Sequence, residues 1–146
     1  MVFTNADITT SLKKYFGFES FKGEQRDIVK SVLDKKNTFV IMPTGGGKSI
    51  TFQVPALAQK GVCIVVTPLI ALMKDQVDTL NARGVPAVAL TSRDGAEEQR
   101  EILEGIRAGQ YTLVYVAPER FRSPRFIDVI YSIAPRISLI AIDEAH

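Results

Sequence analysis

The sequence has little of what marks a specialised class of protein. Among its 146 residues, 18 Lys and Arg oppose 16 Asp and Glu, and the net charge of +2 excludes the strongly basic class whose nucleic-acid binding shows in bulk charge. Its wholly apolar runs, such as residues 62–66, are far too short to span a bilayer. There is no apolar N-terminal segment with a small-residue cleavage site, so we expect an intracellular protein without a membrane segment.

Cysteine and histidine are also scarce. Cys63 is the one cysteine, so no internal disulfide can form, and its apolar neighbours favour burial. Without a cysteine cluster we expect no zinc site. The one histidine, His146, is the last residue. The sequence contains no repeat, low-complexity tract or Pro/Gly/Ser-rich linker, which favours one continuous unit.

The first part of the sequence has the apolar spacing of helices. Ile8, Leu12 and Phe16 recur every four residues, and Asn5 stands where a helix cap is expected. A second helix is predicted from about residue 23 to residue 35.

From residue 38 onward, short runs rich in Val and Ile alternate with helical patterns. Strands are predicted over residues 38–42, 62–67, 85–90, 111–117 and 138–142. One intervening helix has Pro68 in its first turn and Gly84 just after its end, and another carries apolar residues from Ala96 to Ile106. Because these strands barely alternate with polar residues, we predict an α/β fold with a parallel sheet buried between helices. Ligands of such sheets bind at the carboxyl ends of the strands.

A glycine-rich loop follows the first predicted strand and precedes a helix, in the order Pro43-Thr44-Gly45-Gly46-Gly47-Lys48-Ser49. The glycines allow several backbone N–H groups to point into one concavity, and the helix adds its positive N-terminal end. Lys48 supplies a charge for the β- and γ-phosphates, and the Ser49 hydroxyl can ligate Mg²⁺. Met42 occupies the place of the first glycine in the strict phosphate-loop pattern. The alternative is a glycine-rich connector that binds nothing, which would require neither the lysine nor the serine.

The last predicted strand delivers two carboxylates, Asp143 and Glu144, at its carboxyl end. In phosphoryl transfer from nucleotides, one acidic residue holds Mg²⁺ and a second group orients or activates the attacking water. Asp143 suits the first role and Glu144 the second. An ordinary acidic exit from a strand is the alternative, but together with the phosphate loop the pair indicates a metal–nucleotide site.

An ordered series of motifs extends these two features along almost the whole chain. It consists of residues 15–25 (YFGFESFKGEQ), 42–49 (MPTGGGKS), 67–76 (TPLIALMKDQ), 115–120 (YVAPER) and 143–146 (DEAH). The series resembles the successive motifs of superfamily 2 helicases. The segment at residues 15–25 is similar to the adenine-recognition motif of the RecQ family of ATP-dependent DNA helicases.

The resemblance implies a P-loop NTPase fold with a RecA-like sheet. Residues 1–36 would form N-terminal helices carrying the adenine-recognition motif, and residues 37–146 an incomplete first RecA-like domain. A second RecA-like domain, absent from this sequence, would complete a helicase that uses ATP and Mg²⁺ to move 3′ to 5′ and separate DNA strands. Such a protein would act in DNA repair and recombination on single strands and duplex junctions, in the bacterial cytoplasm or the eukaryotic nucleus.

The resemblance also implies roles for individual residues. Lys48 and Glu144 would be catalytic, and Ser49 and Asp143 would hold Mg²⁺. The ATP-binding residues would be Phe18, Lys22, Gln25, Thr44, Gly45, Gly46, Gly47, Lys48 and Ser49.

In the adenine-recognition segment, Gln25 would hydrogen-bond the adenine edge and Phe18 would stack on its face. Lys22 stands where the family usually has arginine, which keeps the charge but loses the planar fork. Phe16 and Phe21 fit apolar positions and are expected in the core.

The middle motifs resemble the DNA-facing loops of the family. The residues implied in DNA contact are Thr67, Pro68, Ser92 and Arg120, and we expect Lys74 and Gln76 to support the fold or to couple DNA contact to the nucleotide site. The cluster of Arg120, Arg122 and Arg125 could equally be a solvated face.

Three other functions stay open. The first is a translocase of the same superfamily that does not unwind duplexes. The second is a P-loop kinase or nucleotide switch, which would need neither the 67–76 nor the 115–120 motif. The third is a non-catalytic nucleotide-binding or interaction module. For the 146-residue chain alone we expect weak Mg-ATP binding at most and no unwinding.

Overall fold

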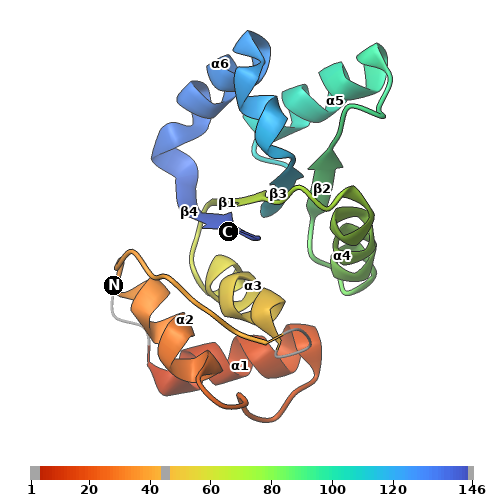
Figure 1. Ribbon diagram of the computed structural model, residues 1–146. Coiled ribbons are helices and arrows are strands. Elements are labelled where there is room, and N and C mark those ends of the chain that lie inside the picture. Colours follow the sequence, from red (N-terminus) through yellow and green to blue (C-terminus); the bar gives the residue numbers. More distant parts are fainter. Residues whose placement is uncertain (1–3, 44–46, 145–146) are drawn as a thin grey trace. The chain divides into compact units, whose positions relative to one another are not determined.

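The computed structural model describes residues 4–43 and 47–144. The chain divides into two compact units, Met1–Lys60 and Gly61–His146 (Figure 1). The sequence predicted one continuous unit instead, because no linker-like composition marks the division. The domain boundary predicted between residues 36 and 37 falls inside the first unit and stays a prediction.

The described part of the first unit is helical, with α1 (Asn5–Phe16), α2 (Gln25–Leu33) and α3 (Lys48–Ala58). Helix α3 packs against both α1 and α2 (Figure 1). The core of the first unit consists of apolar residues at helical spacing, namely Ile8, Leu12, Phe16, Val29, Leu33, Val54 and Ala56. The two helices predicted before residue 36 are therefore confirmed.

Helix α1 is capped by Thr4 and not, as predicted, by Asn5. The Thr4 hydroxyl accepts a hydrogen bond from the Asp7 backbone N–H at 3.2 Å, and the Asp7 carboxylate accepts one from the Thr4 backbone N–H at 2.8 Å. The bond from the Thr4 backbone N–H, and a second one that the Thr4 hydroxyl donates to the Asp7 carboxylate at 2.9 Å, hold the pKa of Asp7 below its ordinary value. Such a reciprocal capping box satisfies two donors at the helix start.

The predicted strand at residues 38–42 is not formed. A strand needs a neighbour that satisfies its backbone groups, and the described residues of the first unit contain no strand. Instead, the hydroxyl of Thr38 bonds the Lys36 carbonyl oxygen at 3.0 Å. Phe39 and Ile41 are 82% and 83% exposed in this structure. The apolar run that suggested a buried strand is thus not buried within its own unit.

The second unit is built on a sheet of β1 (Val62–Val66), β2 (Ala87–Leu90), β3 (Leu113–Val116) and β4 (Ile137–Ile142). Its strand order is β2-β3-β1-β4, and every pairing is parallel. This confirms the predicted α/β fold and four of the five predicted strands.

Three helices connect these strands, α4 (Ile70–Ala82), α5 (Ala96–Arg107) and α6 (Pro124–Ile133). Two short 3₁₀ turns, η1 (Pro118–Arg122) and η2 (Ala134–Arg136), flank α6. Helix α4 begins after an N-cap at Leu69, so Pro68 precedes the helix and does not lie in its first turn as predicted. Helix α6, which the sequence analysis did not assign, starts where the Ser123 side chain accepts a hydrogen bond from the Phe126 N–H.

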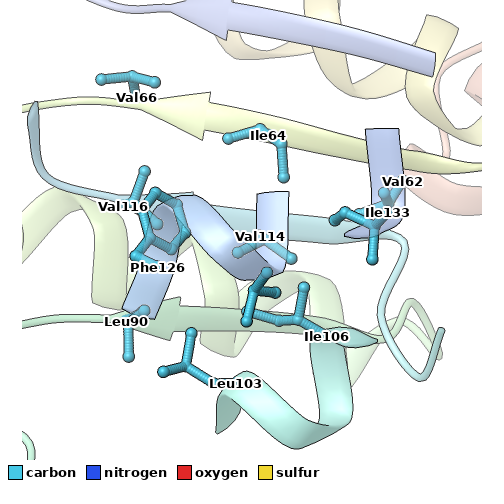
Figure 2. Packing of buried hydrophobic residues seen from close by; sticks show 11 residues of the cluster. Val62, Ile64, Val66, Leu90, Leu103, Ile106, Val114, Val116, Phe126 and Ile133 are labelled. Atoms are coloured by element: carbon cyan, nitrogen blue, oxygen red, sulfur yellow. The ribbon is translucent and has the colours of Figure 1, made fainter. Parts of the chain in front are cut away.

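The core of the second unit lies between the sheet and helices α5 and α6 (Figure 2). Strands β1 and β3 are buried along their whole length, as the unbroken apolar runs predicted. The residues of this cluster are Val62, Ile64, Val66, Leu90, Leu103, Ile106, Val114, Val116, Phe126, Val129 and Ile133. Strand β4 differs, since Ile140 and Ile142 are exposed. No helix in the described part of the chain is both long and apolar enough to cross a membrane.

Cys63 lies outside this cluster, and it provides a simple test of the burial of β1. The thiol is buried in β1, and desolvation raises its pKa from 9.0 to about 12. The reactive thiolate is therefore about a thousandfold rarer, a factor of ten for each pH unit between 9.0 and 12. We expect iodoacetamide to label Cys63 at pH 8 slowly in the native protein and rapidly in denaturant. Rapid native labelling would contradict the burial of β1.

The same pKa shift makes the stability of the folded protein depend on pH. Because the folded-state pKa is raised, the stabilisation from the neutral thiol is complete below about pH 9 and is lost as the pH rises toward 12.

Candidate nucleotide and nucleic-acid sites

The predicted phosphate loop ends at the first turn of α3. Gly47 is the N-cap, with φ 78° and ψ 36° in the left-handed region that favours glycine. Among the described residues no side chain caps α3, and its first turn contains no acidic residue. Lys48 and Ser49 are the first two residues of the helix. This end of α3 therefore offers backbone N–H groups, a cation and a hydroxyl, which suit a phosphate chain. Thr44, Gly45 and Gly46 lie outside the described residues.

The Gln25 side chain joins the adenine-recognition segment to the phosphate loop. Its carbonyl oxygen accepts a hydrogen bond from the Lys22 backbone N–H at 2.8 Å, and its Nε2 donates to the Gly47 carbonyl oxygen at 3.2 Å. Gln25 is only 5% exposed. A carboxamide has two N–H donors and two acceptor lone pairs, so these bonds use half of its capacity. The sequence pointed to Gln25 as an adenine contact, but the link to Gly47 was not predicted.

This link makes Gly47→Ala a sharp test of the loop. A Cβ at residue 47 would lie 2.2 Å from Gln25 Nε2, in addition to the strain of a positive φ. The strain alone costs about 1–3 kcal/mol. We expect the variant to lose stability in urea unfolding and to bind ATP more weakly, because Gln25 must move.

Gly84→Ala is the matched control. Gly84 also has a positive φ, of 81°, but nothing lies within 4 Å of an added Cβ. It should share the loss of stability and keep its ATP affinity. Equal ATP affinities in the two variants would show that the Gln25–Gly47 contact does not shape the site.

The aromatic residues of the adenine-recognition segment differ in exposure. Phe16 is buried at the end of α1, as expected. Phe21 is only partly buried, and the Arg26 guanidinium lies 5.9 Å from its ring centroid. Phe18 is 45% exposed, so part of its surface is accessible to a ligand. The side chain of Lys22 is exposed, while its backbone is fixed by Gln25.

In the second unit, the strand ends carry the polar residues of the other motifs along one edge of the sheet. Leu90, Val116, Val66 and Ile142 are in register across β2, β3, β1 and β4. The pairing extends one residue further, since the Thr67 N–H donates to the Val116 carbonyl oxygen at 3.0 Å and the Asp143 N–H to the Val66 carbonyl oxygen at 2.8 Å. The residues that follow each strand are thus brought to the edge where ligands of parallel sheets bind.

Asp143 and Glu144 follow β4 in an unusual backbone conformation. Glu144 has a φ of 56°, a left-handed conformation that costs a non-glycine residue about 1–3 kcal/mol. Its N–H donates to the Asp143 carboxylate at 3.1 Å. Such strain is concentrated at functional sites. Both side chains are half-buried.

The predicted DNA-contact residues behave differently from one another. Thr67 is buried at 2% exposure, and its hydroxyl accepts from the Leu69 N–H at 3.3 Å. Its side chain therefore shapes the turn into α4. Pro68 and Ser92 are exposed. Their predicted contacts with DNA stay predictions.

Arg120 is the half-buried member of the arginine cluster, while Arg122 and Arg125 are exposed. The Nη1 of Arg120 donates a hydrogen bond to the side-chain oxygen Oε1 of Gln99 at 3.1 Å. Gln99 belongs to α5 and was not singled out in the sequence, because only the fold brings it beside η1.

Gln76 of α4 accepts a hydrogen bond from the Tyr115 hydroxyl of β3 at 2.7 Å. Tyr115 is 1% exposed, so this bond lies in the protein interior. It connects the 67–76 motif to the strand of the 115–120 motif, which agrees with the expectation that Gln76 supports the fold.

The chain is similar to known helicases. Residues 22–146 match the model of the DEAD/DEAH box helicase family. The chain is 46% identical over 136 residues to the ATP-dependent DNA helicase RecQ of Bacillus subtilis, covering 92% of this chain and 23% of the relative. It is 41% identical over 145 residues to the rat ATP-dependent DNA helicase Q5, covering 95% of this chain and 15% of that protein.

A solved structure supports the fold. The hypothetical ATP-dependent RNA helicase from Sulfolobus tokodaii matches with a TM-score of 0.64 at 18% identity, covering 95% of this chain and 50% of that one. The chain spans less than a quarter of the length of either curated relative. The resemblance to RecQ helicases inferred from the motifs is confirmed, and the chain belongs to the DEAD/DEAH box helicase family.

Proposed function

We propose that this chain is the N-terminal ATP-binding part of a RecQ-like helicase that couples ATP hydrolysis to 3′-to-5′ DNA strand separation. The observation that carries the proposal is the buried Gln25 side chain. It bonds both the adenine-recognition segment at Lys22 and the phosphate loop at Gly47. A base-recognising segment attached to a phosphate loop is what an adenine nucleotide requires.

The chain's own residues divide the work on the nucleotide. The N–H groups of α3 and the Lys48 ammonium would hold the β- and γ-phosphates. Phe18 would stack on adenine and Gln25 would bond its edge. We propose Ser49 and Asp143 as the protein ligands of Mg²⁺, because a hydroxyl and a carboxylate are the hard oxygen donors that this ion prefers. Bound Mg²⁺ would neutralise charge developing on the phosphates. Glu144 would activate the attacking water by taking a proton from it.

DNA is the proposed macromolecular partner. Its phosphates would be met by the carboxyl edge of the second unit's sheet, where Pro68, Ser92 and Arg120 follow three neighbouring strands and Thr67 shapes the first turn. The rest of a longer protein would supply a second RecA-like domain and its share of the DNA path. We place the protein inside the cell, in the bacterial cytoplasm or the eukaryotic nucleus.

The adenine site is tested by nucleotide preference in the full-length protein that carries this sequence. We expect single-stranded DNA to stimulate ATP turnover and ATP to be preferred over GTP. Gln25→Ala should reduce that preference about tenfold or more, because a site that bonds a base discriminates strongly against the wrong one. Gln110→Ala, which changes an exposed glutamine, is the control.

If the wild type and Gln25→Ala preferred ATP over GTP equally, Gln25 would not recognise adenine. Turnover that DNA does not stimulate would argue for a nucleotide switch instead of a helicase.

A further inference from the structure

Gln99, near the start of α5, bridges two loops at the carboxyl edge of the sheet. Its Nε2 donates to the Asp94 carbonyl oxygen at 2.8 Å, in the loop that follows β2. Its Oε1 accepts from Arg120 Nη1 at 3.1 Å, in the η1 turn that follows β3. Strands β2 and β3 are neighbours in the sheet, so one side chain ties together the loops after two adjacent strands.

The Asp94 end of this bridge is itself fixed. The Asp94 carboxylate accepts from the Thr91 N–H at 2.8 Å, and the Asp94 N–H donates to the Thr91 carbonyl oxygen at 3.3 Å. Thr91 is buried directly after β2. Because the amide group of Gln99 is committed to Asp94, its carbonyl oxygen must face Arg120.

The partner of Arg120 is neutral. A guanidinium has five N–H donors, and a carboxamide oxygen occupies one of them without cancelling the charge. Arg100, on the same helix as Gln99, is different, because it pairs with the carboxylate of Glu97. Arg120 is thus oriented by an acceptor that leaves its charge available, which suits a cation that must meet a phosphate.

We propose that Gln99 is a positioning residue, which holds Arg120 in the orientation that binds a phosphate of single-stranded DNA. The inference rests on the proposed function, since it needs DNA at this edge of the sheet. Ordering a long side chain in advance removes part of the entropy cost of binding.

The test is a double-mutant cycle in the full-length protein, with Gln99→Met, Arg120→Ala and both together. Affinity for a fluorescent single-stranded oligonucleotide is measured by anisotropy at several salt concentrations. Gln99→Met should weaken binding about threefold to tenfold, as the ordering cost predicts. Arg120→Ala should weaken it at least as much and reduce the salt slope by about 0.7.

The cycle separates positioning from a general structural role. If Gln99 acts through Arg120, adding Gln99→Met to Arg120→Ala should leave the affinity unchanged. Gln99→Glu would place a carboxylate against Arg120 and should weaken binding at least as much as Gln99→Met. Gln110→Met, at an exposed glutamine, is the control for the chemistry of the substitution.

Additive losses in the double variant, or no loss in Gln99→Met, would overturn the proposal. No loss in Arg120→Ala would overturn it too, since Arg120 would then not meet DNA. ATP turnover stimulated by DNA in the wild type would in each case leave the helicase proposal standing. If the wild type neither bound DNA nor increased its ATP turnover with DNA, both the positioning role of Gln99 and the helicase proposal would be wrong.

Discussion

Lys48→Ala is expected to reduce ATP turnover by about 100-fold to 1000-fold, the range seen when one preorganised group is removed from a transition state. Lys48 is the first residue of α3, directly after the left-handed Gly47. That position puts Lys48 at a helix start, where the transferring phosphoryl group would lie in the proposed function. Alanine favours helices, so α3 should persist.

Turnover is measured on the full-length protein with saturating single-stranded DNA. Lys60→Ala, which removes an exposed lysine of the same unit, is the control and should hydrolyse ATP like the wild type. If Lys48→Ala hydrolysed ATP within a factor of two of the control, Lys48 would not hold the phosphates of ATP.

Glu144→Gln is expected to lower ATP turnover by about 100-fold to 10,000-fold with ATP still bound. Glutamine keeps the size of the side chain but cannot take a proton from water. Glu144 directly follows Asp143 after β4, in a left-handed backbone conformation with a φ of 56°. The loss should therefore appear in kcat and not in the affinity for nucleotide.

Glu104→Gln is the matched control, because Glu104 is an exposed glutamate of α5 that lies outside the motifs. A fluorescent ATP analogue reports binding separately from hydrolysis. If Glu144→Gln lost affinity and kcat together, Glu144 would be part of the binding site and not the group that activates water.

The fold was predictable where the signal is local. The unbroken Val and Ile runs of β1 and β3 predicted strands buried on both faces, and the structure places them at the centre of the sheet. The spacing of apolar residues predicted α2 and α5. Helix α6 was missed although Ser123 and Pro124 form a recognisable start, with Phe126, Val129 and Ile133 on its buried face.

Residues 38–42 show where local pattern fails. Their composition predicts a strand, but pairing depends on a neighbour that the sequence pattern does not name. The contacts that organise the candidate sites have the same non-local origin. Gln25 meets Gly47 across 22 residues, and Arg120 meets Gln99 across 21. Motifs predicted which residues carry chemistry, whereas the residues that hold them in place came from the structure.

We propose that this chain is the ATP-binding part of a helicase that moves 3′ to 5′ on DNA. The proposal is tested by strand separation with the full-length protein on duplexes that carry a single-stranded tail at one 3′ end or one 5′ end. We expect ATP-dependent separation of the 3′-tailed duplex, little separation of the 5′-tailed one, and none with Lys48→Ala. Hydrolysis of ATP without separation of either duplex, or separation that persists in Lys48→Ala, would contradict it.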